Sequence, residues 1–126
     1  MKIGELARRS GASARTIRFY EAQGLLGEAA RTESNYREYR TEDLGRLHFI
    51  LQCRALDIGL TEIARLVSLR QMPDANCGEV DEMLDAHIVK VQEQRKSLAI
   101  LEKELKALRA DCHPSQTVKG CRMLRQ

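Results

Sequence analysis

Three of the four cysteines in this chain are candidate thiolate ligands of a metal ion. Cys112 and Cys121 enclose a short polar loop, DCHPSQTVKGC, and Cys77 lies far earlier in the sequence. Thiolate sulfur is a soft ligand, and a site of three thiolates favours Pb(II), Cd(II), Zn(II) or Hg(II) over Mg(II) or Ca(II). Two thiolates alone would instead suit linear Cu(I). The sequence therefore predicts a soft-metal site with Cys77, Cys112 and Cys121 as its ligands.

The segment that separates these cysteines is expected to be one long helix. Residues 79–110 contain no proline or glycine, and their apolar residues recur mostly every three or four positions. A helix of 32 residues is about 48 Å long, so Cys77 and Cys112 of one straight chain cannot meet. Two such helices packed antiparallel would place Cys77 of one chain beside Cys112 and Cys121 of its partner, at two equivalent sites. The apolar seam for this packing is expected at Leu84, Ile88, Val91, Leu98, Leu101, Leu105 and Leu108.

Two histidines and the remaining cysteine are weaker ligand candidates. His113 directly follows Cys112 and could add a fourth ligand, which would favour zinc or cadmium, or it could point to solvent. His87 borders the apolar seam and is interpreted as a seam or surface residue. Cys53 lies inside an amphipathic pattern, FILQCRAL, and is interpreted as a buried thiol that packs as a small apolar residue.

The N-terminal residues follow the pattern of a helix-turn-helix. Ile3, Leu6 and Ala7 share one face of a first helix, and a Gly-Ala-Ser break follows. Ser13 suits the N-cap of a second helix, and Gly24 suits its C-terminal end. This second helix would carry side chains that can donate to phosphates and base edges: Arg15, Thr16, Arg18 and Tyr20.

A short hairpin is expected to follow and to form a wing beside the helix-turn-helix. Residues 32–35 are rich in turn formers, while Tyr36 and Tyr39 favour strands. Arg31, Tyr36 and Arg37 could reach the DNA backbone from this wing. Residues 1–40 carry a net charge of +3, from eight Lys or Arg and five Glu. Charge alone could mean only a solvated face, but the order of helix, turn, helix and wing favours binding of double-stranded DNA.

Residues 41–70 are expected to form two further helices that brace this module. Thr41 is expected to cap the first, and the second is expected to begin at Leu60 or Thr61 after the break Asp57-Ile58-Gly59. The apolar sides are predicted at Leu44, Leu47, Ile50, Leu51 and Leu56, and at Ile63, Leu66, Val67 and Leu69.

The predicted fold class is mainly α, in four parts along the chain. Residues 1–72 form the winged helix-turn-helix domain with its bracing helices, and residues 73–78 form a linker that contains Pro73 and Asn76. Residues 79–110 form the dimerisation helix, and residues 111–126 form the metal-binding loop and the C-terminal tail.

Three stretches carry a close resemblance to the MerR family of transcription regulators. They are IGELARRSGASARTIRFYEAQGLL, NYREYR and LGRLHFILQCRALDIGLTEIARLV, and the resemblance covers essentially the whole chain. It implies a homodimer that binds one promoter, distorts it and so activates transcription by RNA polymerase. Family members that sense divalent ions carry a cysteine where Cys77 stands, and CGEVDEMLDAHI is most similar to the lead- and cadmium-responsive subgroup. Metal efflux or sequestration genes are the expected targets.

Other function classes are less well supported by the sequence. The chain lacks an apolar run long enough to span a membrane and an N-terminal signal peptide, which favours a cytoplasmic protein. It also lacks the residue sets of an enzyme: a Ser/His/Asp set, a phosphate-binding glycine loop or a pair of acidic residues suited to a cleft. Two alternatives stay open: a regulator controlled by a Cys112–Cys121 disulfide, and a metal buffer that does not bind DNA.

Overall fold

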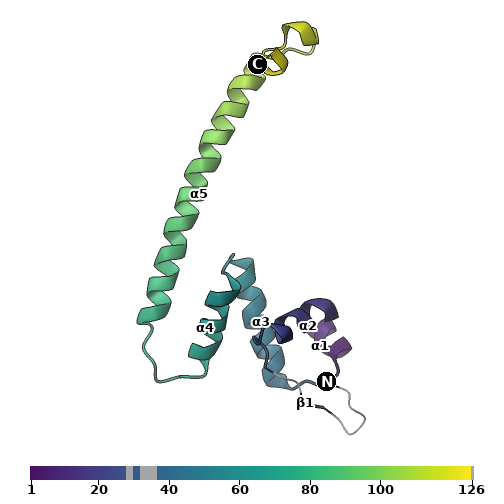
Figure 1. Cartoon of the computed structure of the whole chain (residues 1–126), viewed down its shortest axis with the longest axis vertical. Helices are drawn as coiled ribbons and strands as arrows, with labels where there is room; N and C mark the ends of the chain where they lie inside the picture. The colour runs from purple at the N-terminus through teal and green to yellow at the C-terminus, as the bar shows by residue number, and fades with distance from the viewer. Residues whose placement is uncertain (28–29, 32–36, 126) are drawn as a thin grey trace. The chain divides into compact units, whose positions relative to one another are not determined.

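The computed structural model describes residues 1–27, 30–31 and 37–125. The fold is mainly helical (Figure 1), as predicted. It divides into two units, Met1–Asn76 and Cys77–Gln126. The division falls inside the linker predicted at residues 73–78.

The first two helices form the predicted helix-turn-helix. Helix α1 spans Ile3–Ser10, and helix α2 spans Ala14–Ala22. Gly11 ends α1 with a left-handed φ of 80°, a conformation that glycine adopts without steric cost. The Ser13 hydroxyl accepts a hydrogen bond from the backbone N–H of Thr16 at 3.1 Å, which confirms Ser13 as the N-cap of α2. Leu6 and Ile17 are fully buried and join the two helices through the core.

Gly24 stops α2 with a Schellman motif. Its φ is 77°, its N–H donates to the carbonyl of Glu21, and the N–H of Leu25 donates to the carbonyl of Tyr20. The chain then reaches a two-stranded antiparallel sheet of β1 (Ala30–Arg31) and β2 (Arg37–Glu38). Ala30 pairs with Glu38, and Arg31 pairs with Arg37. The predicted turn at 32–35 lies outside the described residues.

Helices α3 (Thr41–Ala55) and α4 (Leu60–Arg70) complete the first unit. The predicted cap at Thr41 is wrong by one position, because Arg40 precedes the helix and donates its N–H to the Asp43 carboxylate at 2.7 Å. Leu56, predicted on the apolar side, is 62% exposed, because α3 ends at Ala55 and the chain turns away. The core consists of Leu6, Ile17, Tyr20, Leu25, Leu26, Tyr39, Leu47, Ile50, Cys53, Ile58, Ile63, Leu66 and Val67.

Asp57 makes the turn between α3 and α4 in a left-handed conformation. Its φ is 63°, its N–H donates to the carbonyl of Arg54, and the N–H of Ile58 donates to the carbonyl of Cys53. This is a second Schellman motif, with aspartate at the position where glycine is usual. The Arg54 guanidinium also donates to the carbonyl of Ile58 at 2.9 Å, which holds the turn closed.

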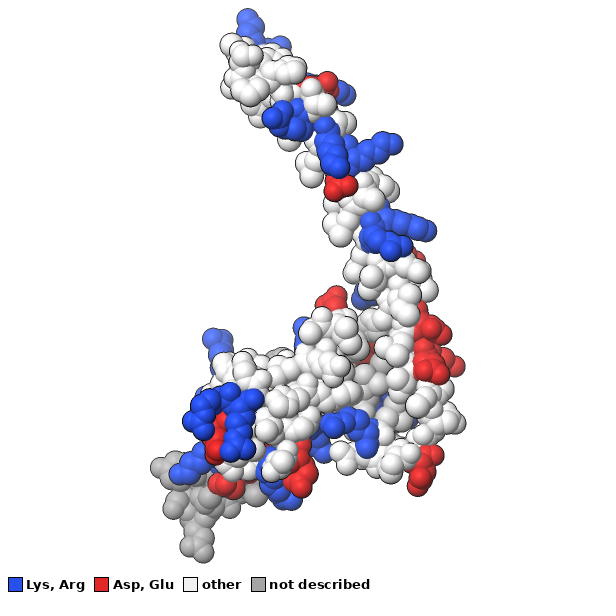
Figure 2. Space-filling view, turned by 180° about the vertical axis from the view of Figure 1, so that it is seen from behind, with Lys and Arg blue, Asp and Glu red and all other residues white. Residues whose placement is uncertain are grey.

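The second unit is one long helix with a short C-terminal loop. Helix α5 spans Gly78–Ala110 and has no buried residue in this single chain. Two 3₁₀ turns follow at Val118–Gly120 and Met123–Arg125. Figure 2 shows basic and acidic side chains along this helix, and basic side chains gathered on the first unit. Among the described residues, every helix is too short or too polar to cross a membrane.

Candidate metal centre and nucleic-acid interface

The C-terminal loop brings Cys121 back to Cys112. Cys112 follows the end of α5, Cys121 follows the first 3₁₀ turn, and their Sγ atoms lie 3.5 Å apart. Two sulfurs bound at about 2.3 Å to one tetrahedral ion lie about 3.8 Å apart, and two bound linearly lie about 4.6 Å apart. The observed separation is shorter than either value, so the two sulfurs are close enough to bind one ion after a small movement of the loop.

The two thiols influence each other in opposite directions. A hydrogen bond with Cys121 raises the pKa of Cys112. The backbone of Leu124, which hydrogen-bonds to the sulfur, and the interaction with Cys112 lower the pKa of Cys121. Cys121 is therefore the thiol of the pair that loses its proton more readily, and the thiolate is the form that binds metal.

Cys77 lies at the opposite end of α5 from this pair. It is exposed and occupies the N-cap position of a helix of 33 residues, whose length is about 50 Å. In the part of the chain that the structure describes, no three Cys, His, Asp or Glu side chains gather as a metal cluster. Within one chain Cys77 therefore does not join Cys112 and Cys121.

The two histidines near these elements stay weaker candidates. His113 is exposed, and its backbone N–H donates to the Gln116 side chain at 3.3 Å, so the structure gives no reason to prefer it as a ligand. His87 is half-buried on α5. Cys53 is 4% exposed within α3, which confirms the prediction of a buried thiol, and burial raises its pKa.

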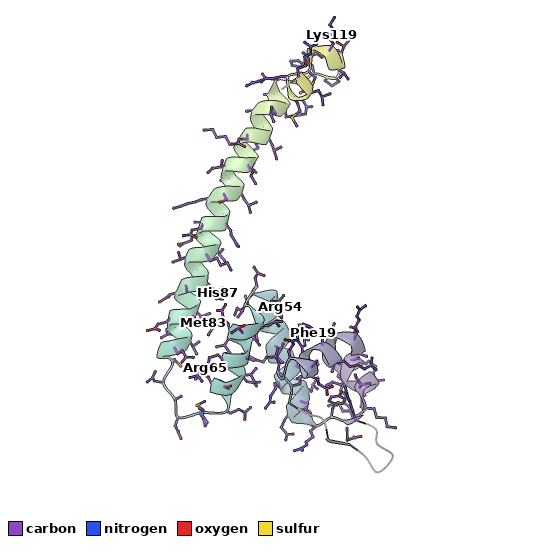
Figure 3. The ribbon with its side chains drawn as sticks, in the orientation of Figure 1. Phe19, Arg54, Arg65, Met83, His87 and Lys119 are labelled. Carbon is purple, nitrogen blue, oxygen red and sulfur yellow. The ribbon has the colours of Figure 1, made fainter. Side chains whose placement is uncertain are left out.

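Helix α2 presents only part of its predicted DNA-binding set to solvent. Arg15 and Arg18 are exposed. Thr16 is half-buried, and its hydroxyl accepts a hydrogen bond from Ser13 at 2.9 Å. Tyr20 is only 6% exposed, so its ring is first of all a core residue. The neighbouring Phe19 is 47% exposed and is the accessible aromatic side chain of the RFY segment (Figure 3).

The wing is attached to α2 through an ion pair that the sequence analysis did not anticipate. The Arg37 guanidinium donates to the Glu21 carboxylate at 2.5 Å, where the Glu21 side chain is 10% exposed and the Arg37 side chain 40%. Arg37 was predicted to reach the DNA backbone, and the structure gives it this second partner. The backbone of Arg31 lies opposite Arg37 in the sheet. Tyr36 lies outside the described residues.

The buried ring of Tyr39 lies close to this partly exposed ion pair and forms a polar cluster with it. Its burial and the nearby Glu21 carboxylate raise the pKa of the Tyr39 phenol, while Arg37 acts in the opposite direction. Among the described residues, neither the Tyr39 hydroxyl nor Oε1 of Glu21 makes a hydrogen bond of good geometry. The sequence contained one indication of the ion pair: Glu21 is the single acidic residue of a helix that is expected to face DNA, so a basic partner within the protein could have been sought.

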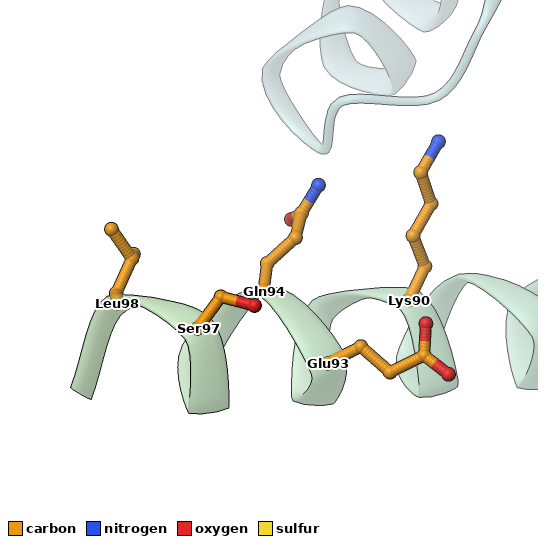
Figure 4. Close-up of a pocket in the computed structure, with 5 residues that line it drawn as sticks. All are labelled: Lys90, Glu93, Gln94, Ser97 and Leu98. Carbon is orange, nitrogen blue, oxygen red and sulfur yellow. The ribbon is translucent and has the colours of Figure 1, made fainter. Parts of the chain in front are cut away.

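A surface pocket on α5 offers a further candidate site. It is lined by Lys90, Glu93, Gln94, Ser97 and Leu98 (Figure 4). All five belong to one helix, and Leu98 is part of the predicted apolar seam. This surface is therefore better suited to helix packing than to a small ligand.

Known protein families match both the DNA-binding unit and most of the long helix. Residues 1–69 match the family described as "MerR HTH family regulatory protein", and residues 44–108 match "MerR, DNA binding". The chain is 44% identical over 109 residues to the HTH-type transcriptional regulator ZntR homolog of Haemophilus influenzae, covering 86% of this chain and 81% of that protein.

Two solved structures of metal-bound regulators are similar along almost the whole chain. The transcription regulator PbrR691 from Ralstonia metallidurans CH34, in complex with lead(II), has a TM-score of 0.88 at 46% identity over 98% of this chain and 96% of that one. The regulator MerR from Bacillus megaterium MB1, in complex with mercury(II), has a TM-score of 0.68 at 29% identity over 96% and 94% of the two chains.

Proposed function

The chain belongs to the MerR family of helix-turn-helix regulators, and from this membership we propose that it activates metal-resistance genes in response to a soft divalent ion. It acts as a homodimer on one promoter, which it distorts so that RNA polymerase can initiate. The sensed ion is Pb(II) or Cd(II), with Zn(II) and Hg(II) as further candidates. The regulator works in the cytoplasm, and no enzymatic reaction is involved.

The observation that carries this proposal is the pair of sulfurs at the end of α5. Cys112 and Cys121 lie 3.5 Å apart, at a distance suited to one ion, while Cys77 is exposed at the other end of the same helix. In an antiparallel dimer, the exposed apolar residues of α5 pack together and Cys77 of the partner completes each site. Three thiolates with no oxygen donor favour a soft ion.

The relatives support the metal-responsive part of the proposal. One similar structure contains lead(II), and another contains mercury(II). The chemistry of three thiolates fits both of these ions.

DNA binding is assigned to the first unit. Arg15 and Arg18 are exposed on α2 and can reach phosphates, and Thr16 lies between them at the start of the helix. Arg31, Tyr36 and Arg37 are assigned to the wing. Tyr20 supports this surface mainly from the core.

The test compares promoter activation in cells that carry a reporter, after exposure to Pb(II), Cd(II), Zn(II), Hg(II) and Cu(I). We expect activation by one or more of the divalent ions and loss of activation in Cys77→Ser. Cys53→Ser serves as the matched control and is expected to keep the response. Activation by Cu(I) alone, or a response that survives Cys77→Ser, would contradict the three-thiolate site.

A redox response is a second candidate, because the two free thiols of Cys112 and Cys121 already lie 3.5 Å apart. Titration of purified protein with Cd(II) or Pb(II) separates the two functions. Thiolate-to-metal charge-transfer absorption supports the metal sensor. Promoter activation by a mild oxidant, with loss of free thiols and no metal response, supports the redox regulator. A metal buffer is excluded if the protein binds its promoter specifically.

A further inference from the structure

The loop between Cys112 and Cys121 is closed by an ion pair that flanks both cysteines. Asp111 directly precedes Cys112, Arg122 directly follows Cys121, and the Arg122 guanidinium donates to the Asp111 carboxylate. The two residues thus join the entrance of the loop to its exit. Arg109, one turn earlier on α5, donates to the carbonyl of Cys112 at 2.9 Å and fixes the same end.

A glutamine side chain bridges the interior of this loop. Gln116 Nε2 donates to the carbonyl of Gly120 at 2.7 Å, and Gln116 Oε1 accepts the N–H of His113 at 3.3 Å. Its amide therefore connects the residue after the first cysteine with the residue before the second. Gly120 gives it room, because a Cβ at this position would lie 3.2 Å from Gln116 Nε2.

From these contacts we propose that Asp111, Arg122 and Gln116 are positioning residues that hold the Cys112 and Cys121 sulfurs at ligand spacing before an ion binds. The three residues are called the loop brace below. The proposal rests on the proposed metal-sensing function for its biological meaning. Its physical content is independent of metal: the loop brace raises the local concentration of one thiol near the other.

The expected contribution of the loop brace to the pairing of the two sulfurs follows from how exposed its side chains are. The Asp111–Arg122 pair is largely exposed, with side chains 44% and 68% accessible, and exposed ion pairs change equilibria by about two- to fivefold. A side-chain hydrogen bond changes an equilibrium by about two- to tenfold. Loss of both the Asp111–Arg122 ion pair and the Gln116 hydrogen bonds should therefore weaken the pairing of the two sulfurs measurably without abolishing it.

Thiol–disulfide exchange measures the local concentration without any metal. One oxidised glutathione converts the two thiols of Cys112 and Cys121 into one disulfide and releases two reduced glutathiones, so atoms and electrons balance. The Cys77→Ser variant of the chain is equilibrated with glutathione buffers. This substitution removes the exposed third thiol, and the remaining thiol outside the loop, Cys53, is buried. The equilibrium constant reports how well the loop holds the two sulfurs together.

We expect this constant to fall about two- to fivefold in Arg122→Gln and about two- to tenfold in Gln116→Ala. Lys119→Gln is the matched control, because Lys119 is an exposed cation in the same loop (Figure 3) and its loss leaves the loop brace intact. Constants for Arg122→Gln and Gln116→Ala that equal that of Lys119→Gln would overturn the proposal.

A charge exchange separates positioning from a general effect of charge. Asp111→Arg and Arg122→Asp alone place like charges together and should each lower the constant, whereas the double exchange restores an ion pair and should recover most of it. A double variant no better than the worse single variant would contradict the proposal.

The same variants with Cys77 restored are then titrated with Cd(II). Arg122→Gln and Gln116→Ala should bind Cd(II) several-fold more weakly with unchanged charge-transfer bands, because the ligands stay the same. If wild type shows no such band, the proposed metal function fails while the glutathione result still decides the fate of the loop brace.

Discussion

Arg18 is the residue on which the DNA-binding assignment can be tested most directly. It is exposed on α2 and lies in the TIRFYE stretch, where a long cation can meet a phosphate. We expect Arg18→Ala to weaken operator binding and to reduce the slope of log affinity against log salt by about one unit. Metal affinity should not change.

The measurement is operator affinity by fluorescence anisotropy at several salt concentrations. Lys103→Ala is the control, because it removes one exposed cation from α5 rather than from the first unit. Operator affinity in Arg18→Ala equal to that of Lys103→Ala would mean that Arg18 makes no phosphate contact.

The polar cluster of Tyr39, Glu21 and Arg37 can be tested by following the ionisation of Tyr39 at alkaline pH. Its phenol has a raised pKa, because burial and Glu21 disfavour the phenolate in the folded protein. A group whose pKa is raised by folding contributes stability below its unfolded pKa, which is about 10 for tyrosine. That stability is lost as pH rises through the folded pKa.

We therefore expect Tyr39 to form its phenolate at higher pH than an unburied tyrosine, as followed by ultraviolet difference absorption. Tyr39→Phe should remove this late step and should make the loss of stability above pH ~10 less steep. Equal alkaline stability profiles for Tyr39→Phe and wild type would show that the phenol is not the group responsible.

At the scale of elements, the connection between α2 and the wing depends on the Glu21–Arg37 ion pair. Both side chains are partly or largely buried, so the pair should orient the wing relative to α2. We expect Glu21→Gln to weaken operator binding without changing its salt dependence, because glutamate makes no phosphate contact. A double-mutant cycle with Arg37→Gln should give a coupling of about 1 kcal/mol in operator binding.

The cycle also decides what Arg37 does. If the losses of operator-binding free energy in Glu21→Gln and Arg37→Gln are additive, and Arg37→Gln alone lowers the salt slope, then Arg37 contacts phosphate independently of Glu21. If the double variant loses no more than either single variant, then Arg37 acts by positioning the wing.

The turn between α3 and α4 carries strain that a single substitution should relieve. Asp57 adopts a φ of 63° in a Schellman motif, where glycine has no steric penalty. Relief of the left-handed conformation is worth about 1–2 kcal/mol, and the freedom of glycine in the unfolded chain offsets about 0.4–1 kcal/mol of it. We therefore expect Asp57→Gly to raise the free energy of unfolding, measured by urea denaturation, by about 0.5–1 kcal/mol. Asp57→Ala keeps the Cβ and loses the polar side chain, so it should not stabilise. Equal changes in both variants would contradict the role of the left-handed conformation.

At the scale of the whole molecule, the proposed sharing of the metal site between two chains can be tested with a mixed dimer. Cys77→Ser and Cys112→Ser should each abolish sensing alone. In their heterodimer, Cys77 of one chain meets intact Cys112 and Cys121 of the other at one end, while both serines meet at the opposite end. Twofold symmetry then gives about half of the wild-type metal stoichiometry.

Titration of the purified heterodimer with Cd(II) or Pb(II), followed by charge-transfer absorption, measures the number of rebuilt sites. If each chain formed its own site, both sites of the heterodimer would be damaged and no binding would return. The length of α5, about 50 Å, is the physical reason to expect the shared arrangement.

Sequence alone determined the features whose physical signals are local. Apolar periodicity indicated the helices, and it placed the long helix at 79–110, one residue from the observed start of α5 at Gly78. Ser13 and Gly24 marked the ends of α2, and the burial of Cys53 followed from its helix face. These signals are local because caps, turns and helix faces depend on residues within a few positions of one another.

Only the tertiary structure decided which distant residues meet. It joined Glu21 to Arg37, brought Cys121 within 3.5 Å of Cys112, and placed Tyr20 in the core, where sequence reasoning had expected a DNA contact. Such contacts depend on how the chain returns through turns and loops, and residue spacing does not specify that path. A helix of about 50 Å also keeps Cys77 away from the loop of its own chain, which is why the proposed third thiolate would have to come from a partner chain.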